Sequence, residues 1–321
     1  MLSSKAATFL LTFTLLAIVQ LVVDIPMLLA ERFVHGAGWI EVLLLASYAS
    51  WLLGRLHDPR NTIVWRRRLW TFFSVVFFAQ LTIGLSGVEL FLMSGDLHLP
   101  IPAMIIAGPL YRGDGLFMPI LFVSTILIVG PAWCSYLCYI GSWDLNSAVA
   151  RKRPIPSKVN RFWMRLGIVV GVAGVAVMLR VVGVSTVVAT WLGVAFGVVG
   201  VGYIVWLSRR AGYMVHCTMY CPIGLAADLL GKLSPFRLRI NDGCTECGAC
   251  TLKCRYDALR PSDIKARRPG LTCTLCGDCL ASCKGKSIEY RFAGLTPQHA
   301  RTVFLVLAVS LHTVFLGVAR I

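Results

Sequence analysis

Eight cysteines in the last third of the chain fall into two short runs with the same spacing. Each run reads C-x2-C-x2-C-x3-C, the first over residues 244–254 and the second over residues 273–283. Three cysteines on one tight loop can reach three corners of a cubane [4Fe–4S] core, and in two-cluster ferredoxins the fourth ligates the other cluster. Disulfides need no duplicated spacing, and zinc sites usually use two ligand pairs separated by a longer loop. The spacing therefore predicts two [4Fe–4S] clusters, with the ligands Cys244, Cys247, Cys250, Cys254, Cys273, Cys276, Cys279 and Cys283.

The rest of the chain is too apolar for a soluble domain. Hydrophobic residues make up 57% of the 321 residues and charged residues only 14%, and the mean hydropathy is +0.74. This composition is typical of a multi-span membrane protein with one small polar insert. The net charge of +16 is scattered beside the apolar runs and does not gather on one tail or face. We therefore expect membrane lipid, and no nucleic acid, as a partner.

Apolar runs of about 20 residues, the length that crosses a bilayer, recur along the sequence. They indicate an all-α polytopic membrane protein of about seven transmembrane helices, with a small α+β two-cluster bacterial-ferredoxin-like domain inserted before the last helix. The expected spans are residues 7–30, 38–54, 69–92, 118–140, 162–181, 185–207 and 302–319. The apolar connection 97–117 is expected on the outer membrane surface. The predicted domains are two N-terminal helices (1–65), a duplicated four-helix core (66–235), the ferredoxin-like domain (236–292) and a C-terminal helix (293–321).

The clusters of Arg and Lys all fall on one side of this topology. The run Arg66-Arg67-Arg68 is interpreted as one such cytoplasmic marker. The positive-inside rule then places the N-terminus in the cytoplasm and, after seven spans, the C-terminus outside. Thiols that bind metal need a reducing compartment, which puts the cysteine-bearing side in the cytoplasm too. We predict a multi-pass protein of the inner (cytoplasmic) membrane with its clusters on the cytoplasmic face.

A second repeat lies upstream of the ferredoxin runs. Cys134 and Cys138 form a C-x3-C motif that recurs as Cys217 and Cys221 at an offset of 83 (217 minus 134), and each motif ends an even-numbered span. Spacing of i and i+4 puts two sulfurs on one helix face, so two facing helices would bring four thiolates together. This arrangement suits a third iron–sulfur centre, although four thiolates suit zinc equally well. Redox-active thiols without metal, and cysteines that only pack, are the other interpretations.

One histidine and three carboxylates fall at positions where they could take part in the chemistry. His216 precedes Cys217 and could tune the C-x3-C site, but we expect it to be a satisfied surface residue. Asp24, Glu41 and Glu89 lie within or beside the spans, toward their outer ends. Intramembrane acids are costly and often mark proton paths, as quinol oxidation would require. The competing interpretation is that all three lie in the headgroup zone.

Basic residues flank the last ligand of each ferredoxin run. Their positive field would favour the reduced clusters and guide a negatively charged partner, unless they only form a solvated basic face. The sequence contains no Gly-rich phosphate cradle, so NAD and flavin are not indicated. The four residues are Lys253, Arg255, Lys284 and Lys286.

Paired spans ending in C-x3-C, followed by two C-x2-C-x2-C-x3-C runs, resemble the membrane polyferredoxins. These include NapH- and MauN-type quinol-dehydrogenase subunits, the membrane half of the NosR regulators and CcoG-type proteins. The resemblance covers about residues 66–292. It implies a bound quinone or quinol in the bilayer and partner redox subunits of a larger complex, ferredoxin-like or cytochrome. The chain departs from the family where Tyr139 replaces a proline and where no proline follows Cys254 or Cys283.

These features favour a membrane-bound electron-transfer subunit. It would pass electrons between the quinone pool, or a partner redox enzyme, and iron–sulfur clusters on the cytoplasmic face. A second interpretation is a CcoG-like assembly factor that reduces a metal such as copper for a metalloenzyme, and a third is a redox sensor. No residue set indicates bond-making catalysis, so an enzymatic role would be that of one component of an oxidoreductase complex, such as a quinol dehydrogenase subunit.

Overall fold

The computed structural model describes residues 2–92, 99–155, 157 and 159–318. Among these residues, seven helical stretches are long and apolar enough to cross a membrane, which confirms the predicted fold class. Two of them change helix type along their length and continue through short 3-10, π or α segments. The seven are α1 (Leu2–Val22), α3 (Gly38–Leu56), α4 (Pro59–Leu85), α6 (Phe117–Val129) with η2 (Gly130–Ala132) and η3 (Trp133–Leu137), α8 (Arg161–Val181), α9 (Thr186–Gly202) with η4 (Tyr203–Ser208) and α10 (Arg209–Ala211), and α14 (Pro297–Val318).

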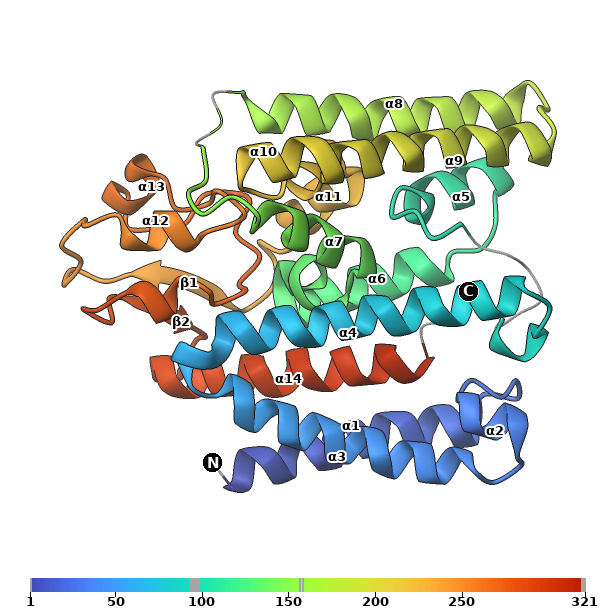
Figure 1. Ribbon diagram of the computed structural model, residues 1–321, viewed down its shortest axis with the longest axis horizontal. Helices are drawn as coiled ribbons and strands as arrows, with labels where there is room; N and C mark the ends of the chain where they lie inside the picture. Colours follow the sequence, from blue (N-terminus) through green and yellow to red (C-terminus); the bar gives the residue numbers. More distant parts are fainter. Residues whose placement is uncertain (1, 93–98, 156, 158, 319–321) are drawn as a thin grey trace.

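The long helices form layers with a loop-rich unit at one end. α1 and α3 pack as a pair on one side, α4, α6 and α14 form the middle, and the α8–α9 hairpin lies on the other side (Figure 1). α14 is the most buried of the seven spans, whereas α8 and α9 are among the most exposed. The short helices are α2 (Leu29–Phe33), η1 (Glu89–Phe91), α5 (Met104–Arg112), α7 (Tyr139–Ala148), η5 (His216–Tyr220) and α11 (Pro222–Leu230).

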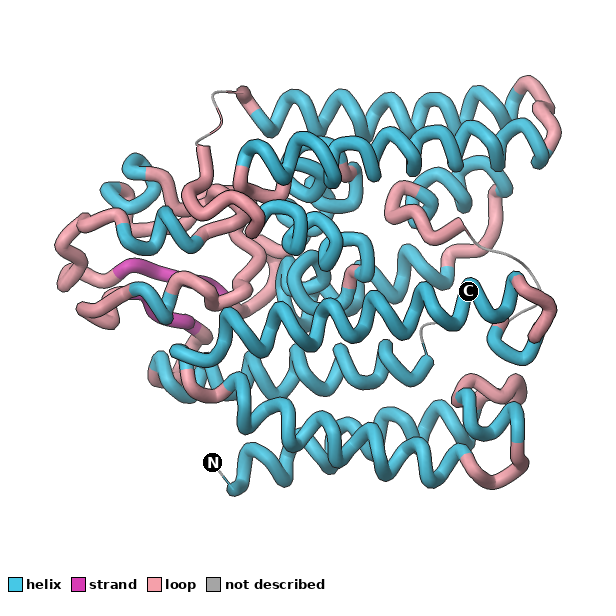
Figure 2. Tube along the Cα trace, in the orientation of Figure 1, coloured by secondary structure: helices cyan, strands magenta, loops and turns pink. Residues whose placement is uncertain are grey.

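The ferredoxin-like layer caps the end of the bundle at which the N-terminus begins, and loops make up most of it (Figure 2). Strand β1 (Arg237–Ile240) pairs antiparallel with β2 (Ile288–Arg291), with Leu238 opposite Tyr290. Alternate residues of both strands are buried, and the Tyr290 ring packs on Phe304 of α14 at a centroid distance of 5.0 Å. This two-stranded sheet therefore joins the cysteine loops to the central span. The loops themselves carry α12 (Ala249–Lys253), α13 (Pro261–Lys265) and η6 (Leu280–Ser282).

Several helix boundaries differ from those expected, and two of them bear on the predicted site residues. The first span ends at Val22, before Asp24 and Pro26. The third begins ten residues earlier than expected (69 minus 59), because Asp58 caps it and accepts a hydrogen bond from the Arg60 backbone N–H at 3.0 Å, with Pro59 at the first helical position. The basic run 66–68 is therefore helical.

The connection between α4 and α6 is only partly described, because residues 93–98 lie outside the described part of the chain. The sequence predicts that this connection lies on the membrane surface, but its described part does not do so throughout. Ile101 packs against Gly197 of α9, where a Cβ would come within 2.7 Å of Ile101 Cδ1. Pro102 reaches the cavity that holds the C-x3-C cysteines. Residues 99–103 are apolar and carry no charge, which allows this part of the connection to enter the bundle.

Candidate metal centres

The two C-x3-C motifs are built by the same break in two different helices. Cys134 and Cys217 lie in the π-helical turns η3 and η5, and Cys138 and Cys221 end those turns in extended conformation. Each turn closes with an i to i−5 backbone hydrogen bond, 3.0 Å at Cys138 and 2.8 Å at Cys221. The expectation that both sulfurs share one regular helix face is therefore wrong in detail. The chain turns at the second cysteine, and a new helix begins there.

The new helices point their first backbone N–H groups at the sulfurs. The amides of Ile140 and Gly141 hydrogen-bond to Cys138, and the equivalent amides of α11 do so to Cys221. Unpaired N–H groups at a helix N-terminus favour negative charge, here a thiolate. A Cβ on Gly141 would lie 2.4 Å from the Trp70 ring, and one on Gly224 would lie 2.7 Å from the Cys217 carbonyl oxygen. Close packing thus explains why glycine recurs at this place in both motifs.

The four C-x3-C cysteines line one cavity, which we call the membrane-side site. Its free volume is only about 10 Å³, and Trp133, Pro102 and Ile223 are among its other lining residues. Among the described residues, no three His, Cys, Asp or Glu side chains are close enough to hold a single metal ion. An iron–sulfur cluster does not require such closeness, because its cysteines bind different iron atoms. The members of the site are Cys134, Cys138, Cys217 and Cys221.

Seven of the eight ferredoxin cysteines interact electrostatically in two groups that exchange their fourth members, and Cys247 belongs to the second group by its place in the motif. The charge on Cys279 is influenced by Cys273, Cys276 and also by Cys254, the last cysteine of the first run. Cys250 is influenced by Cys244 and by Cys283, the last cysteine of the second run. This exchange is the ligand pattern of two-cluster ferredoxins. We call Cys254, Cys273, Cys276 and Cys279 the inner site, and Cys244, Cys247, Cys250 and Cys283 the outer site.

Both cysteine loops adopt the same unusual backbone conformation. Glu246 and Leu275, each just before the second cysteine, have φ of 56° and 57°, and Gly248 and Gly277, just after it, have φ of 71° and 80°. Left-handed conformation is costly for residues other than glycine and tends to persist at functional sites. The matched strain in two loops indicates a shared task, which is to wrap the backbone around a compact group.

Backbone amides also approach the last cysteine of each run. Ala258 N–H lies 3.3 Å from Cys254 Sγ, and Ser287 N–H lies 3.2 Å from Cys283 Sγ. Burial raises the pKa of Cys254 to about 11 and that of Cys276 to about 12, whereas the Ala249 N–H lowers the pKa of the exposed Cys247. The inner site is therefore drier than the outer site.

Three buried Arg–Asp ion pairs hold the ferredoxin layer and the C-x3-C region in place. Arg66 of α4 binds both carboxylate oxygens of Asp278, at 2.8 and 2.5 Å, and also donates to the Ser135 carbonyl at 3.2 Å. Asp278 lies between two inner-site cysteines in sequence. Arg165 of α8 pairs with Asp228 of α11 at 2.7 Å. Arg66 thus anchors the ferredoxin layer to α4 through a buried partner, a role that the sequence did not predict.

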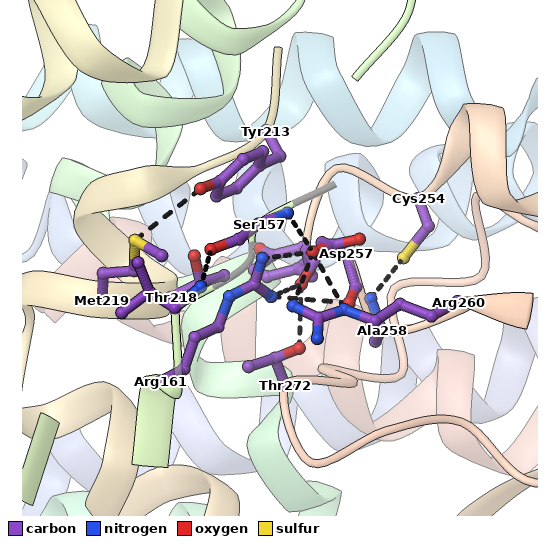
Figure 3. A network of polar contacts seen from close by, with 12 residues as sticks. Ser157, Arg161, Tyr213, Thr218, Met219, Cys254, Asp257, Ala258, Arg260 and Thr272 are labelled. Carbon is purple, nitrogen blue, oxygen red and sulfur yellow. Dashed lines mark hydrogen bonds and ion pairs between the residues drawn. The ribbon is translucent and has the colours of Figure 1, made fainter. Parts of the chain in front are cut away.

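The third pair lies beside Cys254 and joins α8 to the first cysteine run. Arg161 donates to the Asp257 carboxylate, which also accepts from Arg260 at 2.9 Å (Figure 3). The Arg161 guanidinium lies 4.9 Å from the centre of the Tyr213 ring. The two guanidinium groups offset the free-energy cost of burying the charged Asp257 carboxylate.

Direct hydrogen bonds connect the inner site to the membrane-side site. Tyr256 Oη donates to the Cys134 carbonyl at 2.7 Å, and Tyr136 Oη donates to the Cys276 carbonyl at 3.1 Å. Ser135 Oγ donates to the Thr274 carbonyl at 3.1 Å. The membrane-side site and the inner site are therefore direct neighbours. Sequence reasoning found the cysteines but not these tyrosines and ion pairs, which carry no recognisable motif.

His216 is not the satisfied surface residue that the sequence indicated. Its side chain is buried, with 6% of the residue exposed, and neither ring nitrogen has a hydrogen bond of good geometry. The Gly200 backbone also interacts with the ring. The π-helical turn directs His216 inward, which a regular surface turn would not do.

The remaining predicted residues lie away from the cysteines. Asp24 and Glu89 are exposed, and Glu41 accepts a hydrogen bond from the Ala30 backbone N–H at 2.7 Å. In the part of the chain that the structure describes, none of the three lines the cysteine cavity. Arg255 is half-buried and donates to the carbonyls of Gly212 and Arg151, at 2.6 and 2.9 Å, so it holds the backbone. The other three basic residues beside the last ligands, Lys253, Lys284 and Lys286, are exposed.

A family model described as a 4Fe-4S binding domain matches residues 112–155 and 170–241. These segments contain both C-x3-C motifs and end before the ferredoxin runs. A protein named "Putative electron transport protein YccM", from Escherichia coli K12, is 34% identical over 68 residues, which is 21% of this chain and 18% of that protein. The uncharacterized protein MJ0750 of Methanocaldococcus jannaschii is 25% identical over 80 residues, 25% of this chain and 32% of that protein.

The chain thus spans less than a third of each of these relatives' own length. No solved structure matches it. Together, the fold, the duplicated cysteine loops and the family match define a 4Fe-4S ferredoxin-type protein with helices compatible with multi-pass insertion.

Proposed function

We propose that this chain is a membrane-bound electron-transfer subunit. It passes electrons between the quinone pool, or a partner redox enzyme, and iron–sulfur clusters on the cytoplasmic face of the inner membrane. The observation that supports the proposal is the direct hydrogen bonding between the membrane-side site and the inner site, through Tyr256, Tyr136 and Ser135. Oxidation of one quinol releases two electrons and two protons, and each cluster accepts one electron at a time.

Within this proposal the membrane-side site holds a third iron–sulfur centre. Four cysteines around one cavity, with helix N–H groups directed at Cys138 and Cys221, supply ligands and charge compensation for a cluster. The inner site then holds a [4Fe–4S] cluster that relays electrons, and the outer site holds a second one that meets the partner redox subunit. The exposed Cys247 and the neighbouring lysines place the outer site at the protein surface.

The test is anaerobic purification of the full chain in mild detergent, followed by iron and sulfide analysis and reduction with a quinol. We expect about twelve irons per chain if the third centre is a [4Fe–4S] cluster and about ten if it is a [2Fe–2S] cluster. About eight would remove the third centre. Decylubiquinol or menadiol should bleach the visible absorbance of the clusters within the time of mixing. Clusters that neither quinol reduces and neither quinone reoxidises would overturn the quinone-linked function, and reduction of Cu²⁺ instead would favour an assembly factor.

A further inference from the structure

A second, larger cavity lies against the membrane-side site. Its volume is about 340 Å³, at the lower end of the range for pockets that hold small molecules. Four residues line both cavities, so the two share a wall. These are Pro102, Ile140, His216 and Cys221.

The cavity is apolar and reaches the lipid-facing side of the bundle. Aromatic rings from four elements line it, namely Phe78 of α4, Trp143 of α7, Phe196 of α9 and Tyr220 of η5. Val198 of α9 also lines it and is 64% exposed. A molecule dissolved in the bilayer can therefore enter between α9 and its neighbours without crossing water.

Among the described residues that line this cavity, His216 has a buried side chain whose ring nitrogens make no hydrogen bond of good geometry. A buried imidazole that makes no hydrogen bond is costly, unless a ligand provides one. Nδ1 lies on the Gly200 side of the ring, 3.2 Å from where a Cβ of Gly200 would be, and Nε2 has no partner. A neutral imidazole can donate a hydrogen bond from Nε2 to a quinone carbonyl or, as the other tautomer, accept one from a quinol hydroxyl.

We propose that this cavity binds the head group of a membrane quinone, with His216 Nε2 hydrogen-bonded to one ring oxygen. The aromatic lining matches a flat ring, the lipid-facing opening fits an isoprenoid tail, and the shared wall sets the ring beside Cys221. This proposal rests on the quinone-linked function above and names its binding site. An acyl chain of a phospholipid would fill the same apolar space but would leave His216 unpaired.

The binding test uses an azido-substituted ubiquinone on the full-length, cluster-loaded protein kept oxidised, so that no turnover is needed. We expect the label to map by mass spectrometry to residues 99–103 or 194–222 and to be displaced by excess decylubiquinone. Val201→Phe places a ring in the cavity and should reduce labelling at least tenfold. Val199→Phe makes the same change two residues away on α9, at a position that does not line the cavity, and should label normally.

A second variant tests the hydrogen bond. His216→Leu should weaken decylubiquinone binding about tenfold, as the loss of one hydrogen bond predicts, while His216→Gln should recover part of it. The iron content of each variant is measured in parallel, because His216 adjoins Cys217. Equal labelling of V201F and wild type, or labelling that excess decylubiquinone does not displace, would overturn the site in favour of a resident lipid. If the label maps to this cavity but quinol does not reduce the clusters, only the electron-transfer function is overturned. If quinol reduces the clusters but the label maps elsewhere, only the proposed site is overturned.

Discussion

The ferredoxin loops and the C-x3-C turns meet the same demand, four cysteines around one space, with different backbones. Each ferredoxin loop wraps three cysteines within seven residues by placing residues such as Leu275 and Gly277 in left-handed conformation. The C-x3-C site instead joins two helices that are broken at Cys138 and Cys221, each with two cysteines. The loops depend on local strain, whereas the C-x3-C site depends on tertiary packing. The two should therefore fail in different ways when they are altered.

Removing one cysteine from the inner site or from the membrane-side site should give the largest changes in iron content. Cys276→Ala should cost about four irons and abolish the inner cluster's EPR signal, whereas Cys221→Ala should cost the irons of the membrane-side site and spare both ferredoxin-type signals. Iron and sulfide counts with EPR of the dithionite-reduced protein measure both. Undiminished iron in C221A would show that the C-x3-C cysteines pack or act as free thiols.

The buried ion pairs test how the two layers are held together. Asp278→Ala leaves the Arg66 guanidinium buried without its carboxylate, and loss of one partner of such a pair costs about 3–5 kcal/mol. Asp114→Ala breaks the exposed pair with Arg112 and should cost at most about 1 kcal/mol. Thermal unfolding in detergent, followed by tryptophan fluorescence, compares the two. Similar midpoints for both variants would mean that the buried pair does not fasten the ferredoxin layer.

The difference between the layers also explains what the sequence could predict. The sequence predicts the ferredoxin ligands because their spacing is set within a single loop. It predicts the seven spans because hydropathy is a local property. The structural role of Arg66 could not be predicted, because its partner Asp278 lies 212 residues away in the sequence. His216 was misread because the π-helical turn that buries it has no sequence signature. Contacts between distant segments are set by packing, which spacing alone does not encode.

Equivalent glycines of the two ferredoxin loops offer a finer comparison. Both Gly248 and Gly277 have positive φ, so alanine at either position should cost about 1–2 kcal/mol. A Cβ on Gly248 meets nothing within 4 Å, whereas one on Gly277 would lie 2.9 Å from Tyr290 Oη, which donates to the Leu275 carbonyl. Gly277→Ala should therefore cost about 1 kcal/mol more, through displacement of that hydroxyl. Equal loss of thermal stability would contradict the crowding at the inner loop.

The smallest expected effect concerns the exposed lysines of the outer site. Lys284→Glu reverses one charge beside Cys283 and should slow reduction of a small acidic electron carrier such as flavodoxin a few-fold at low salt, with no change in iron content. The slowing should vanish near 0.5 M salt, where exposed charges are largely screened. Lys265→Glu, on α13, makes the same change in net charge away from the last ligand of either run and serves as the control. If both variants slow transfer equally, the lysines form a general basic face. If only K284E does, the outer site is where electrons leave or enter the protein, because only there does local charge govern the encounter.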